Sequence, residues 1–146
     1  MDKKRGKWWK IELYDFLNIT NNDIEKEIIE SIMKTKQELK GLAKERTCMI
    51  YSSYIYNYLR YKNIICRIID TQEDLKMNYQ HRFVLVPKNE KENYIIDVTY
   101  TQFKEDETFE KLYQKGYQLV SQAIYQKYLD NIENSNKKGV SRWIYL

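Results

Sequence analysis

The chain has 146 residues, of which 42% are hydrophobic and 32% charged, with one proline and four glycines. This composition excludes the disordered and fibrous classes and fits one globular domain over residues 1–146. The 25 basic and 21 acidic side chains leave a formal net charge of +4, a balance that does not predict a nucleic-acid partner. No apolar stretch is long enough to span a bilayer, and no apolar core of a signal peptide follows the basic start.

Residues 1–10 form a basic and aromatic N-terminal segment, in which Lys3-Lys4-Arg5 precedes Trp8-Trp9. Such a segment can contact phosphates or a membrane surface. The simpler interpretation is a frayed basic end whose tryptophans pack on the domain, and we favour it.

Two helices are predicted in the first half of the chain. The polar residues 21–23 form a helix entry, apolar side chains recur at helical spacing over residues 24–39, and Gly41 is placed to end that helix. Thr47 can cap a second helix. That helix would carry Cys48 in its first turn.

Three strands are predicted next, over Ile64–Ile69, His81–Val86 and Tyr94–Val98. Pro87 stops the second strand, and the polar segment Lys88–Asn93 is typical of a hairpin turn. The second and third strands should therefore be antiparallel neighbours, with a histidine on one and an aspartate on the other.

The remaining sequence predicts helices over Thr108–Lys115 and Ser121–Tyr128, a loop over Asn134–Gly139 and a last short strand over Ser141–Leu146. The order of elements indicates an α+β fold in which a helix packs on an antiparallel sheet.

Three residues in this arrangement point to chemistry. A helix N-terminus favours ionisation of Cys48, and His81, the single histidine of the chain, could act as its base. A carboxylate inside an apolar strand is costly without a partner, so Asp97 is the candidate that orients the imidazole. Each residue has a structural alternative, because lone cysteines and strand histidines are usually core residues.

Two rival interpretations remain open. A metal site could use Cys48, Cys66, His81 and Asp97, but no Cys-x-x-Cys pair is present, and Cys66 between isoleucines is typical of a small core residue. A non-catalytic protein- or nucleic-acid-binding module could instead use the N-terminal segment and the 14 tyrosines as its contact surface.

The order of Cys48 at a helix start, then His81-Arg82-Phe83-Val84-Leu85-Val86, then Asp97, resembles the papain-like/transglutaminase-like superfamily of cysteine hydrolases. Within it, Asp97-Val98-Thr99-Tyr100-Thr101-Gln102-Phe103 is most similar to bacterial papain-fold toxins and effectors that deamidate glutamine side chains. The resemblance implies a nucleophile helix packed on the antiparallel sheet, a Cys48–His81–Asp97 triad, a thioacyl intermediate and no cofactor or metal.

The resemblance leaves three reactions open at one site: glutamine deamidation, which we prefer, transglutamination and thiol proteolysis. No oxyanion-hole glutamine of the papain kind precedes Cys48, and Val98 stands where many relatives carry proline. Backbone amides and Gln37, Gln80 or Gln102 are the alternative oxyanion donors, with Gln102 better suited to brace the strand end.

The same resemblance implies a biological setting. It predicts a bacterial effector or toxin whose partners are a substrate protein and, where one exists, an immunity or inhibitor protein. Localisation would be the bacterial cytoplasm, or a target cell reached without a usual signal peptide.

Overall fold

The computed structural model describes residues 23–40, 47–103 and 105–137. Residues 1–10, Gly41 and the predicted strand over Ser141–Leu146 lie outside these ranges. In the described part, α3 (Ile24–Glu38) and α4 (Thr47–Tyr61) precede β1 (Arg67–Asp70), β2 (Arg82–Pro87) and β3 (Glu92–Ile96). The short 3-10 helices η1 (Tyr100–Gln102) and η2 (Glu107–Phe109) lead into α5 (Glu110–Lys115), β4 (Tyr117–Ser121) and α6 (Gln122–Lys137).

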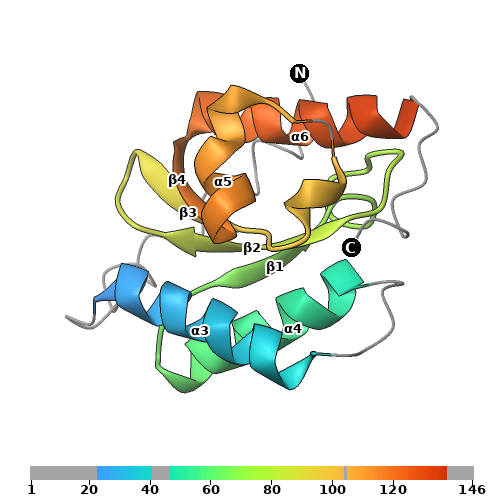
Figure 1. The fold of residues 1–146 in the computed structure, drawn as a ribbon. Coiled ribbons are helices and arrows are strands. Elements are labelled where there is room, and N and C mark those ends of the chain that lie inside the picture. Colours follow the sequence, from blue (N-terminus) through green and yellow to red (C-terminus); the bar gives the residue numbers. More distant parts are fainter. Residues whose placement is uncertain (1–22, 41–46, 104, 138–146) are drawn as a thin grey trace.

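The sheet is fully antiparallel, and its strands lie in sequence order, β1-β2-β3-β4. Figure 1 shows α3 and α4 on one face of the sheet and α5 and α6 on the other. Along β2 the side chains alternate between the faces, because successive residues of a strand point in opposite directions. Phe83 and Leu85 face the α5–α6 layer, whereas Val84 and Val86 face the α3–α4 layer. The α+β prediction with an antiparallel sheet is confirmed.

The first helix starts where the sequence predicts it. Asp23 is the N-cap, and its carboxylate accepts a hydrogen bond from the Lys26 backbone N–H at 3.2 Å. Ile28 and Ile32 are buried one turn apart against the core of the α3–α4 layer. This burial of a regular apolar stripe explains why the segment is helical and structural.

Several element boundaries and one strand differ from the prediction. The first strand begins at Arg67 rather than Ile64, and the loop predicted over Asn134–Gly139 is helical as far as Lys137. Asparagine and serine are weak helix formers, but Ile132 and Ser135 continue the buried face of α6 and so extend the helix. The strand β4 was not predicted, and it completes the sheet beside β3.

No helix within the described ranges combines the length and apolarity needed to cross a membrane.

Candidate active site

Cys48 lies in the first turn of α4, as the sequence predicts. The helix begins at Thr47, and the backbone N–H groups of a first turn lack partners within the helix. These groups give the surroundings of the thiol a partial positive charge. Cys48 is 2% exposed. The predicted capping role of Thr47 involves a side chain outside the described part of the chain.

His81 lies one residue before β2 rather than inside it. Its backbone is fixed on both sides by Thr71, whose hydroxyl accepts from the His81 N–H at 2.9 Å and whose own N–H donates to the His81 carbonyl at 2.9 Å. The imidazole packs edge-on against the Phe103 ring, with centroids 4.8 Å apart. These contacts hold a ring that is 1% exposed.

Asp97 follows the last residue of β3, so the expectation that it lies within the strand is wrong by one residue. Its N–H still donates to the Gly116 carbonyl at 2.8 Å, after which the chain turns into η1. Its carboxylate Oδ2 lies 2.7 Å from His81 Nε2. The start of β2 and the end of β3 therefore bring the two predicted residues together.

The His81 ring and the Asp97 carboxylate form a buried ion pair. Burial by itself lowers the pKa of His81, but the negative charge and hydrogen bond of Asp97, together with a hydrogen bond to the Cys48 thiol, outweigh it and raise the pKa to about 10. The ring is therefore an imidazolium at neutral pH. All three predicted residues are in contact, with His81 in the middle.

The two ring nitrogens of His81 have different partners. Nε2 is bonded to Asp97, so Nδ1 is the nitrogen left for the Cys48 thiol. An imidazolium beside a thiol stabilises the thiolate, and its proton can pass to a leaving group. The arrangement can therefore carry out nucleophilic acyl transfer.

Cys66 does not belong to this cluster. Arg67 pairs with Leu85 and Asp70 with Arg82, so Cys66 lies near the far end of β2, about 15 Å along the strand from His81. Burial raises the pKa of the Cys66 thiol to about 12. Among the residues that the structure describes, no three His, Cys, Asp or Glu side chains are grouped to hold a metal ion.

The three glutamines predicted as alternative oxyanion donors are either exposed or bonded to other groups. Gln37 is exposed on α3, and the Gln80 amide donates to Asp70 Oδ2 at 2.8 Å. Gln102 is buried and donates to the Thr99 carbonyl at 3.0 Å, which is the bracing role expected of it.

Sequence reasoning missed three residues that contact the His81 ring or the Asp97 carboxylate. The Tyr128 hydroxyl donates to Asp97 Oδ2 at 2.7 Å, and the Thr99 hydroxyl donates to Oδ1 at 3.1 Å. Phe103 supplies the ring against which His81 packs. Thr99 and Phe103 belong to the segment that carried the family resemblance, whereas Tyr128 lies on α6 and gives no local signal in the sequence.

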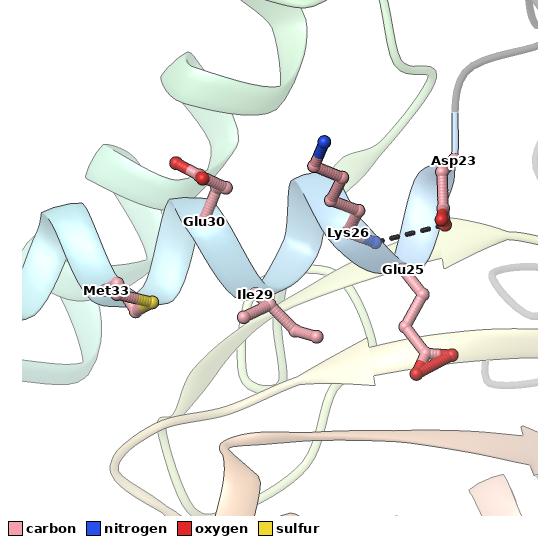
Figure 2. Close-up of a pocket in the computed structure, with 6 residues that line it drawn as sticks. All are labelled: Asp23, Glu25, Lys26, Ile29, Glu30 and Met33. Carbon is pink, nitrogen blue, oxygen red and sulfur yellow. Dashed lines mark hydrogen bonds between the residues drawn. The ribbon is translucent and has the colours of Figure 1, made fainter.

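A separate hollow of about 390 Å³ lies along α3 (Figure 2). Its described lining comes from one helix and consists of Asp23, Glu25, Lys26, Ile29, Glu30 and Met33. Because none of these residues is Cys48, His81 or Asp97, the hollow is distinct from the candidate active site.

Comparison of the chain with family models, with characterised proteins and with solved structures found no match.

Proposed function

We propose that the chain is a cysteine-dependent acyl-transfer enzyme acting on protein amides through Cys48, His81 and Asp97. The observation that carries the proposal is the buried His81 ring, which lies 2.7 Å from Asp97 Oδ2 through Nε2 and interacts with the Cys48 thiol. A buried ion pair with a thiol beside it is costly to maintain for packing alone. Perturbed titratable groups of this kind cluster at catalytic sites.

The preferred reaction is deamidation of a glutamine side chain. The Cys48 thiolate attacks the carboxamide carbon and a C–S bond forms. His81 then protonates the amide nitrogen, and the C–N bond breaks to release ammonia and leave the thioester. His81 then takes a proton from water, the hydroxide attacks the thioester, and cleavage of the C–S bond releases glutamate. An amine in place of water gives transglutamination, and a peptide bond in place of the carboxamide gives proteolysis.

Deamidation is preferred because the segment Asp97–Phe103 resembles bacterial papain-fold deamidases. The same resemblance supports a papain-like/transglutaminase-like fold assignment, the setting of a bacterial effector or toxin, and a substrate protein as partner. It also makes an immunity protein a partner to seek, and it fits a site that works in the bacterial cytoplasm or after delivery to a target cell.

The test is intact-mass and peptide-mass analysis of dimethylated casein and of a bacterial protein extract after incubation with the chain. A gain of about 1 Da per glutamine indicates deamidation, amine adducts indicate transglutamination, and fragments indicate proteolysis. The matched control is Cys48→Ala, which should abolish any of the three while Cys66→Ala retains it. Equal results for wild type and Cys48→Ala in both substrate pools would contradict the proposal and favour the binding module.

A further inference from the structure

Both oxygens of the Asp97 carboxylate accept hydrogen bonds from the protein. Oδ2 lies 2.7 Å from His81 Nε2 and also accepts from the Tyr128 hydroxyl at 2.7 Å, while Oδ1 accepts from the Thr99 hydroxyl. Tyr128 is fully buried, and burial together with the charge of Asp97 raises its pKa well above the usual value. The phenol therefore stays protonated and remains a donor.

Packing fixes the position of this hydroxyl. The Tyr128 ring contacts Phe83 edge-on at 4.9 Å between centroids and stacks on Tyr100 at 5.4 Å. Tyr128 belongs to α6, so it reaches Asp97 from the layer opposite to α4, which carries Cys48 (Figure 1). The chain of contacts Cys48–His81–Asp97–Tyr128 thus connects the two helical layers at one end of the sheet.

We propose that Tyr128 is a positioning residue of this site, fixing the Asp97 carboxylate against His81 and sharing the negative charge of Oδ2. The inference rests on the proposed acyl-transfer function. A neutral donor on Oδ2 weakens the pull of that oxygen on the imidazolium proton. Tyr128 therefore keeps the His81 proton available for the leaving group while Asp97 keeps the ring oriented.

A structural role alone makes a different prediction. If the phenol only satisfies its own hydrogen bond in the core, its removal lowers stability and leaves the His81 ring unchanged. If Tyr128 shares the charge of Oδ2, removing the hydroxyl strengthens the His81–Asp97 bond. The state of the imidazole distinguishes the two roles.

The experiment is NMR of the protein labelled with ¹⁵N-histidine, in which His81 gives the single histidine signal. In Tyr128→Phe, the ring N–H proton should move downfield at neutral pH, and the pKa of His81 should rise by about half a unit. Tyr125→Phe is the matched control, because it removes the same atom from a buried tyrosine that also contacts Phe83. Unchanged His81 signals in Tyr128→Phe, or the same change in both variants, would overturn the proposal.

A second variant keeps the test decisive if Tyr128→Phe folds poorly. Thr99→Val removes the donor to the other oxygen and should shift His81 in the same direction by a smaller amount; a shift to lower pKa would overturn the proposal.

Turnover of dimethylated casein provides a separate readout. Tyr128→Phe should lower kcat about tenfold with KM unchanged, because the hydroxyl acts through Asp97 and does not touch substrate. The NMR measurement needs no substrate. A failure of the proposed role of Tyr128 can therefore be distinguished from a failure of the proposed acyl-transfer function. A shifted His81 signal in a protein without Cys48-dependent turnover refutes the acyl-transfer function, whereas Cys48-dependent turnover with an unshifted His81 refutes the role of Tyr128.

Discussion

The two helical layers bury different kinds of side chain. The core between α3–α4 and the sheet is mainly aliphatic, and its fully buried members include Ile28, Ile55 and Leu59. The core under α5–α6 is rich in aromatic rings, among them Phe109 and Tyr128. Because a tyrosine packs as an apolar ring and still carries a hydroxyl, the aromatic layer can deliver a hydrogen-bond donor into a buried polar cluster. An aliphatic core cannot.

The two helical layers contribute different residues to the candidate active site. The helix α4 of the aliphatic layer supplies Cys48, the proposed nucleophile, while the aromatic layer supplies Tyr128 and Phe103, which contact Asp97 and His81. The end of the sheet lies between the two layers and positions His81 and Asp97, the proposed base and its orienting acid. Substitutions on the two sides should therefore have separable effects.

The largest effect should come from the cysteines. Cys66 is more exposed than Cys48, at 8% against 2%, yet burial raises the pKa of Cys66 to about 12. Because the thiolate is the reactive form and Cys48 contacts an imidazolium, iodoacetamide should alkylate Cys48 first, and His81→Ala should slow that reaction about 100-fold. Intact mass with time measures both rates. Faster labelling of Cys66 would reverse the assignment of the nucleophile.

The next largest effect should follow Asp97→Asn. Since the folded-state pKa of His81 is about 10, above its ordinary value of 6.5, the protonated ring stabilises the fold fully below pH 6.5, and this stabilisation is lost as pH rises through 10. Asp97→Asn removes the opposing charge and should lower the pKa of His81, and turnover should fall about 30-fold. Urea unfolding across pH 6 to about 10 should show a decline in wild type that the variant lacks. Identical pH profiles would contradict the buried ion pair.

A matched pair of leucines tests the layers directly. Leu59 on α4 and Leu129 on α6 are both fully buried, so either Leu→Ala substitution should lower the free energy of unfolding by about 3 kcal/mol. Because Leu129 is the neighbour of Tyr128, its replacement should also move the His81 NMR signal, whereas Leu59→Ala should not. An equal shift of the His81 signal in both variants would contradict the idea that only the α5–α6 layer positions the His81–Asp97 pair.

The smallest expected effect is that of Gly116→Ala. Gly116 has φ of 84°, and a Cβ there would lie 2.8 Å from Val98 Cγ1, so both backbone strain and a clash oppose alanine. We expect a loss of about 2 kcal/mol in unfolding free energy. Lys115→Ala, one residue earlier and exposed, is the control and should change stability little. Differential scanning calorimetry measures both, and a Gly116→Ala protein as stable as wild type would show that the backbone adapts.

The sequence was sufficient to predict where Cys48, His81 and Asp97 lie in the secondary structure, because these signals are local. A helix cap at Asp23, the position of Cys48 at a helix start, and a polar turn between two β-branched runs each depend on neighbouring residues. The hairpin predicted over Lys88–Asn93 then places His81 and Asp97 on neighbouring antiparallel strands. The strand boundaries were off by one to three residues, since pairing and not propensity decides where a strand starts.

The remaining features depend on contacts between distant segments. Tyr117–Ser121 is a strand because β3 offers it an edge, and its own five residues carry no strong alternation. Tyr128 was assigned to a helix by its spacing, but its partner Asp97 is 31 residues away. No pattern within one segment predicts such a pairing.

The wide separation of these partners along the chain has a consequence for folding. The contacts of the site join residues 16 and 31 positions apart and draw on α4, both central strands and α6. Closing loops of this length costs entropy that is recovered only when the sheet and both helical layers are in place. In a nascent or partly unfolded chain the thiol, the imidazole and the carboxylate therefore lie apart. The Cys48–His81–Asp97 cluster forms only together with the complete native topology.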